Sequence, residues 1–207
     1  TAIGRVVHAE AKAHRAQAHH DIKLLREAHE DMEVAEKLIP NNPYVYQIGS
    51  YISVVGYQIG LANDKPEIQE EYLALGRRYA DHLTSHFPDN KICLAFAARF
   101  YALIDDTEKA TDTWESAFQQ GLRGFWLTEY LHHLERLGQH SEALAIFKQL
   151  ETPTGSEVLR YAIFLDDTNE AKRELERVLS QLEAPVAIAA LAVFKPDIAN
   201  QANALLQ

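Results

Sequence analysis

The chain has 207 residues, of which 47% are hydrophobic and 24% charged, and these globular values exclude a mainly disordered protein. Its formal net charge of −10 argues against a nucleic-acid partner, and no apolar run reaches the roughly 20 residues of a membrane-spanning helix. The single cysteine, Cys93, excludes an internal disulfide and fits a reducing compartment such as the cytoplasm, although it does not identify one. Glycine and proline are scarce and strong helix formers dominate, so we expect helices throughout.

A recurring motif indicates that these helices form repeated antiparallel hairpins. The motif is an apolar residue, a short polar turn and an alanine that enters a helix. It occurs at 104–110, 137–143 and 165–171, and residues 22–28 occupy the same place upstream. Fixed-period similarity of this kind is the sequence signature of repeat architectures, in which each unit packs on its neighbours.

The distances between landmark alanines predict one long hairpin and one short one. Ala28 and Ala110 are 82 residues apart, which exceeds two periods of about 34 residues by about 14. We therefore expect an elongated second hairpin, with helical runs over Tyr44 to Leu61 and Glu67 to Phe87. Ala143 and Ala171 are only 28 residues apart, so the fifth hairpin should have a shortened first helix.

The pattern resembles the tetratricopeptide repeat, a unit of about 34 residues with small and large side chains at fixed positions. The third unit matches best and the fourth follows it, with Leu131 where a small residue is usual. The first unit matches in its second helix, although Lys12 and His19 replace expected large residues. The matching residues are Ala16, Ala28, Met32, Ala35 and Pro40 in the first unit; Leu94, Ala98, Tyr101, Ala110, Trp114 and Ala117 in the third; and Leu127, Leu134, Ala143 and Phe147 in the fourth.

This resemblance implies an all-α fold, a right-handed superhelical stack of antiparallel hairpins (an α-solenoid) with about twelve helices. We expect one domain over residues 1–207, which forms part of a longer protein. Its units would cover 9–42, 43–90, 91–123, 124–151 and 152–184, followed by terminal helices at 185–207.

Chemistry-bearing residues are present, but their spacing does not predict a catalytic or metal site. His82 and His86 have the i, i+4 spacing of zinc helices, yet the sequence offers no third ligand beside them. Asp105-Asp106 and Asp166-Asp167 lie at turns, where aspartate caps the following helix. No phosphate-binding loop or nucleophile motif occurs. We therefore expect no enzyme activity, no cofactor and no metal, and a metal protein built on His82 and His86 is the weakest alternative.

The resemblance implies a protein or peptide partner held in a groove lined by the first helices of the hairpins. Aromatic and arginine side chains beside amides are types that anchor interfaces. Ile48, Phe96 and Leu103 could instead complete the core. The family's lysine and asparagine clamp for chaperone C-termini is absent, since Ala13 and Gln17 occupy those positions. The candidate groove residues are Tyr44, Gln47, Tyr51, Phe96, Arg99, Phe125, His132 and Arg160.

A different class of function also fits the sequence. The chain could be a structural spacer or oligomerisation element of a larger protein. Residues 185–207 are apolar and rich in alanine, so they could form a homodimer contact or meet further domains. Deleting that segment would then abolish association.

Overall fold

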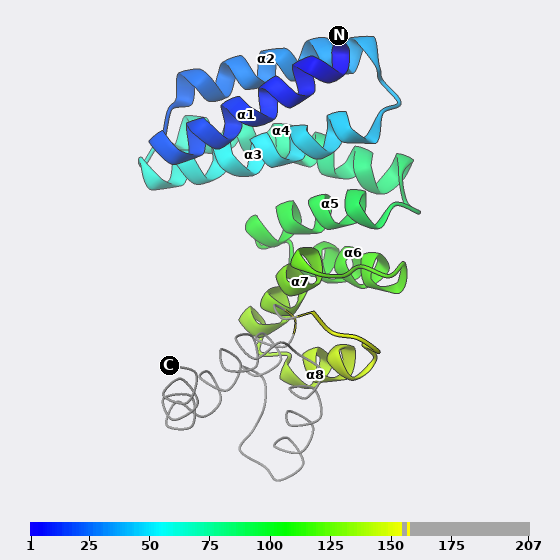
Figure 1. Cartoon of the computed structure of the whole chain (residues 1–207). Coiled ribbons are helices and arrows are strands. Elements are labelled where there is room, and N and C mark those ends of the chain that lie inside the picture. Colours follow the sequence, from blue (N-terminus) through cyan, green and yellow to red (C-terminus); the bar gives the residue numbers. More distant parts are fainter. Residues whose placement is uncertain (155–156, 158–207) are drawn as a thin grey trace, which may run out of the picture. The chain divides into compact units, whose positions relative to one another are not determined.

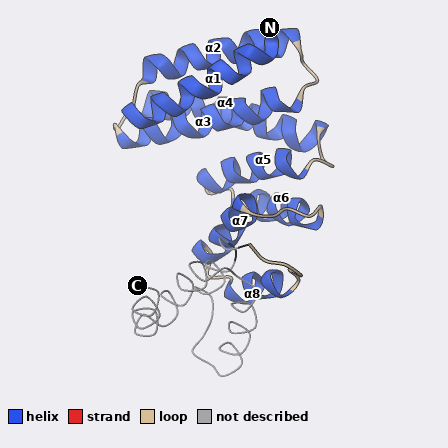
Figure 2. Ribbon diagram, viewed as in Figure 1, coloured by secondary structure: helices blue, strands red, loops and turns tan. Residues whose placement is uncertain are grey.

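The computed structural model describes residues 1–154 and 157, and within them every regular element is a helix (Figure 2). The all-α prediction is confirmed for this part of the chain. The chain divides into two compact units, unit 1 over Thr1–Leu122 and unit 2 over Arg123–Gln207. The helices are α1 (Ala2–His19), α2 (Ile22–Leu38), α3 (Pro43–Ala62), α4 (Pro66–His86), α5 (Lys91–Leu103), α6 (Thr107–Gln119), α7 (Phe125–Arg136) and α8 (His140–Lys148).

Local sequence signals fix where the helices of unit 1 begin. The side chains of Asp21, Asn42 and Asn90 accept hydrogen bonds from the first backbone N–H groups of α2, α3 and α5. Pro43 and Pro66 occupy the first turns of α3 and α4, where a missing N–H costs nothing. These two helices, with 20 and 21 residues, are the longest described, as the elongated second hairpin predicted.

The helices of unit 1 pack as three successive hairpins, α1 with α2, α3 with α4, and α5 with α6 (Figure 1). The first helix of each hairpin also contacts the first helix of the next, so that α3 lies against both α1 and α5. In addition, α2 contacts α3 and α4 contacts α5. Each hairpin therefore covers an apolar face of its neighbour, which a lone hairpin would expose to water.

Close helix contacts in unit 1 depend on glycines that face large rings. A Cβ added at Gly49 would come within 2.5 Å of the Tyr79 ring, and one at Gly56 within 2.2 Å of Tyr72. The closest approach is at Gly76 of α4, where a Cβ would meet the Phe100 ring of α5. Rings on one helix thus fill the space that an absent side chain leaves on the next.

Apart from Pro40, which is exposed, the repeat landmarks of the described residues lie in the core. The matching alanines of the first, third and fourth units, together with Met32, Trp114 and Phe147, are at most 1% exposed. Leu94 and Tyr101 are also buried. The small and large residues of the sequence pattern are therefore core residues that pack between the helices. α1 begins at Ala2, before the start predicted for the first unit at residue 9, because Thr1 caps it and Val6 extends its buried stripe.

Unit 2 contains the α7 and α8 hairpin and a fully buried carboxylate. Glu157 is 0% exposed and accepts bonds from Arg123 Nε (3.1 Å) and from a terminal Arg123 nitrogen (3.0 Å). The backbone N–H groups of Gly124 (2.8 Å) and Thr154 (2.6 Å) also donate to it. Gly124 has a φ of 62°, a left-handed value that favours glycine. Glu157 therefore ties residue 154 to the start of α7.

Several predictions concern residues outside the described part of the chain. The fifth hairpin, Arg160 and the terminal segment 185–207 fall there, so the count of twelve helices, the spacer function and the dimer contact stay predictions. Eight helices lie in the described residues. None of them combines the length and hydropathy that a membrane crossing requires.

Candidate binding surfaces

Five of the eight predicted groove residues lie on adjoining first helices of unit 1. Tyr44, Gln47 and Tyr51 belong to α3, and Phe96 and Arg99 to α5. We call the surface that they form with three neighbours on α1 the first-helix face; its members are Glu10, His14, Gln17, Tyr44, Gln47, Tyr51, Phe96 and Arg99.

Two tyrosines of α3 bind side chains of α1. The Tyr44 hydroxyl donates to Glu10 Oε2 at 2.5 Å. Burial, with the Glu10 hydrogen bond as the second cause, raises the pKa of Tyr44 to about 12. The Tyr51 hydroxyl lies 2.8 Å from His14 Nδ1 and donates to Gln17 Oε1 at 3.0 Å. These bonds fix the spacing of α1 and α3 along the first-helix face.

Polar contacts also join α3 to α5. Gln47 Nε2 donates to Cys93 Sγ at 3.2 Å, and the Ser50 hydroxyl donates to the Phe96 carbonyl at 3.3 Å. Cys93 is buried, and burial raises the pKa of its thiol, so it is not activated as a nucleophile. Burial also raises the pKa of Tyr51, and the Arg99 guanidinium acts in the opposite direction.

The predicted groove residues differ in how much surface they offer. Tyr51 is only 9% exposed, because His14 and Gln17 cover its hydroxyl. Tyr44, Gln47, Phe96 and Arg99 are half-buried. Ile48 is 2% exposed and belongs to the core, the alternative that the sequence left open, whereas Leu103 is partly buried. The accessible part of the first-helix face therefore consists mainly of residues other than Tyr51.

Two other predicted residues lie in unit 2. Phe125, at the start of α7, is 59% exposed, and its ring meets that of Trp126 edge to face at a centroid distance of 5.3 Å. His132 is exposed, and its Nδ1 lies 3.1 Å from Glu135 Oε2. These residues are described within unit 2 alone.

Charge separates between the first and second helices of unit 1. The helices α1, α3 and α5 together carry five Lys or Arg residues against one acidic residue. The helices α2, α4 and α6 carry six Lys or Arg residues against twelve acidic ones. Two of the α1 cations, Arg5 and Lys12, bind Asp31 of α2 at 2.9 and 2.8 Å. The second helices are therefore the main source of the negative charge of this unit.

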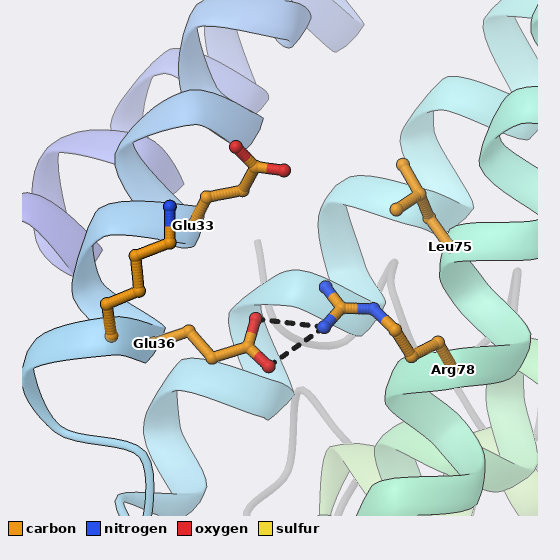
Figure 3. A pocket seen from close by; sticks show the side chains of 5 residues that line it. Glu33, Glu36, Leu75 and Arg78 are labelled. Atoms are coloured by element: carbon orange, nitrogen blue, oxygen red, sulfur yellow. Dashed lines mark hydrogen bonds and ion pairs between the residues drawn. The ribbon is translucent and has the colours of Figure 1, made fainter.

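A pocket that the sequence interpretation missed lies between α2 and α4. It measures about 470 Å³ and is lined by Glu33, Glu36, Lys37, Leu75 and Arg78 (Figure 3). Arg78 donates from one nitrogen to both oxygens of Glu36, at 2.8 and 3.0 Å. The helical spacing of Glu33 with Glu36 and Lys37, and of Leu75 with Arg78, was the available signal. Nothing in the sequence alone indicated that these two stripes would face each other.

The two histidines with metal-ligand spacing stack on each other. The rings of His82 and His86 have centroids 3.9 Å apart and an interplanar angle of 6°, and Tyr46 stacks on His82 at 3.7 Å. Burial and then the neighbouring His86 lower the pKa of His82. In the described part of the chain, no group of three or more metal-ligating side chains comes together. The arrangement is that of an aromatic stack at the end of α4.

The described residues define an all-helical protein of packed hairpins. Comparison with protein-family models and with curated proteins finds no match to this chain. The resemblance to the tetratricopeptide repeat therefore stays a prediction from sequence.

Proposed function

We propose that this chain is a non-catalytic binding scaffold, whose first-helix face holds a segment of another protein. The observation that carries the proposal is the side-by-side packing of α1, α3 and α5, joined by the Tyr44–Glu10, Tyr51–His14 and Gln47–Cys93 contacts. Such cross-linked helices offer a preformed surface, which lowers the entropy cost of binding an extended or helical peptide.

The finer architecture is part of the same proposal. Successive hairpins that stack in a constant sense produce a tetratricopeptide-like superhelix, with the first helices lining one side. The packing order of α1 to α6 supports this arrangement. Arg99 is the side chain to which we assign the largest share of affinity, since a guanidinium offers five donors to carbonyl or carboxylate oxygens.

The proposal predicts that charge reversal at Arg99 weakens the binding of partner proteins. In affinity capture from a native lysate, Arg99→Glu bait should retain its interaction partner at least roughly tenfold less well than the wild-type chain, because arginine anchors commonly contribute about 2 kcal/mol. Arg77→Glu is the matched control, since Arg77 is an exposed cation of α4 with the same change of charge. Equal recovery of every captured protein by the two variants would contradict the assignment.

A further inference from the structure

The pocket between α2 and α4 lies at one of two ion-paired positions along these helices. Arg26 of α2 binds Glu71 of α4 at 2.9 Å, and ten residues further along α2, Glu36 binds Arg78. The two pairs follow the same order on both helices, so α2 and α4 run parallel. We call the line of contact between α2 and α4 that contains these two ion pairs the α2–α4 seam. It is formed by second helices and does not include any residue of the first-helix face.

The seam already holds one guanidinium group. The Arg78 guanidinium carbon lies 4.3 Å from the centroid of the Tyr79 ring, while one of its nitrogens binds both oxygens of Glu36. A carboxylate on one side and an aromatic face on the other are the two partners that a planar guanidinium prefers. The local chemistry is therefore suited to arginine.

Beside this pair, the pocket offers a second carboxylate that is not used. Glu33 lies one helical turn before Glu36 and Lys37, and within the described residues its carboxylate has no hydrogen bond or ion pair. Figure 3 shows Glu33 and Glu36 extending from α2 toward Leu75 and Arg78 on α4. Leu75 gives the pocket an apolar wall, against which an alkyl stem can pack.

Two residues close to the pocket lining along the helices, Tyr79 and His29, have buried polar atoms without a hydrogen bond. The Tyr79 side chain is 1% exposed, and its hydroxyl has no hydrogen bond of normal geometry, although Arg78 lies over its ring. Nε2 of His29, one turn before Glu33, is also buried without a partner. Burial lowers the pKa of His29, which favours its neutral form, and the Glu33 carboxylate is the largest influence in the other direction.

The charge around the pocket selects the sign of its ligand. Together, α2 and α4 carry nine acidic side chains against five Lys or Arg residues. Such an excess attracts cations over a distance of about a Debye length and repels anions. The lining itself holds two carboxylates and two cations, and both Glu33 and Lys37 are exposed, so the excess negative charge comes from the surrounding residues of α2 and α4. The balance therefore favours a cation that adds to the Glu33 carboxylate.

We propose that the α2–α4 pocket binds an arginine side chain of a partner protein. The guanidinium pairs with the Glu33 carboxylate beside the Glu36–Arg78 pair, and its alkyl stem packs on Leu75. This is a second contact surface, separate from the first-helix face, and a partner can occupy either one without the other.

A peptide titration tests this proposal on the intact chain. The probe is a five-residue peptide with blocked ends and a central arginine, and its control carries uncharged citrulline in place of arginine. We expect saturable NMR shifts of the Leu75 methyl groups and the His29 ring with the arginine peptide alone. Glu33→Gln should weaken binding roughly tenfold, since hydrogen bonds to charged groups contribute about 1.5–3 kcal/mol.

Glu30→Gln is the matched variant, because it removes the same charge from an exposed position of α2 outside the pocket lining. Its affinity should stay within about twofold of the wild-type value. Equal weakening by Glu30→Gln and Glu33→Gln would show that only net charge attracts the peptide. That result would overturn the assignment of the pocket as the binding site. Equal binding of the citrulline peptide, or no saturable shift at millimolar concentration, would overturn it as well.

Discussion

Replacing Gly76 with alanine should destabilise unit 1 by about 3 kcal/mol or more, at the upper end of the cost of overpacking a core. The added Cβ would lie 1.9 Å from Cε2 and 2.4 Å from Cζ of Phe100. Phe100 is 0% exposed, so its ring has no free volume into which to move. The helices α4 and α5 must therefore separate, and they would lose contacts along their whole interface. Urea unfolding followed by the helical circular dichroism signal measures the loss.

Two further variants separate overpacking from the general effect of a glycine substitution. Gly4→Ala, in an exposed part of α1, should change stability by less than about 1 kcal/mol, because the better helix propensity of alanine offsets a mild contact of its Cβ with the exposed Thr1 hydroxyl, 3.1 Å away. Adding Phe100→Leu to Gly76→Ala should recover part of the lost stability, since it removes the ring atoms that collide. Wild-type stability of Gly76→Ala would show that α4 and α5 are not packed this closely.

Replacing Glu157 with glutamine should destabilise unit 2 by about 3 kcal/mol, the scale of breaking a buried ion pair. Glutamine keeps one acceptor oxygen, but its NH2 group, itself a donor, would face a donor from Arg123, Gly124 or Thr154 and leave both without a partner. The loss should appear as faster amide hydrogen exchange in α7 and α8. Glu151→Gln is the matched control, because Glu151 is exposed in the same loop. Equal exchange in both variants would contradict the structural role of Glu157.

The same carboxylate makes unit 2 sensitive to acid. Burial alone would raise the pKa of Glu157, but the bonds from Arg123 and from the backbone of Thr154 and Gly124 outweigh it and lower the pKa below the ordinary 4.5. A lowered pKa means that the stabilisation is complete above pH 4.5 and is lost as the pH falls through the folded-state value. Glu157→Gln should therefore remove this part of the acid sensitivity.

The helices and their pairing were predictable because their signals are local. Asn42-Pro43 and Pro66 mark helix starts, and the alanines of the repeat mark where two helices approach. The burial of Tyr51 was not predictable in this way, because the groups that cover it come from α1, at least 34 residues earlier in the chain. A single helix pattern shows that Tyr51 faces the neighbouring first helix, but it does not show how far that neighbour reaches.

The pocket between α2 and α4 was missed for a related reason. Glu33 and Arg78 each belong to a polar stripe that reads as an ordinary solvated helix face. Only the packing of both helices on α3 brings the two stripes together. Gly76 and Phe100 illustrate the same limit, because the sequence does not specify which ring fills the space at a glycine. Contacts between repeats depend on helix rotation and spacing, which the repeat pattern leaves undefined.

Site-specific photo-crosslinking tests the central claim, that the first-helix face binds another protein, most directly. A photoreactive amino acid replaces Gln47, which is half-buried on α3, and in a second variant replaces Gln119, which is exposed at the end of α6. In native lysate we expect a discrete protein adduct from position 47 and none of that mass from position 119. The same adducts from both positions, or no adduct from position 47, would contradict the claim.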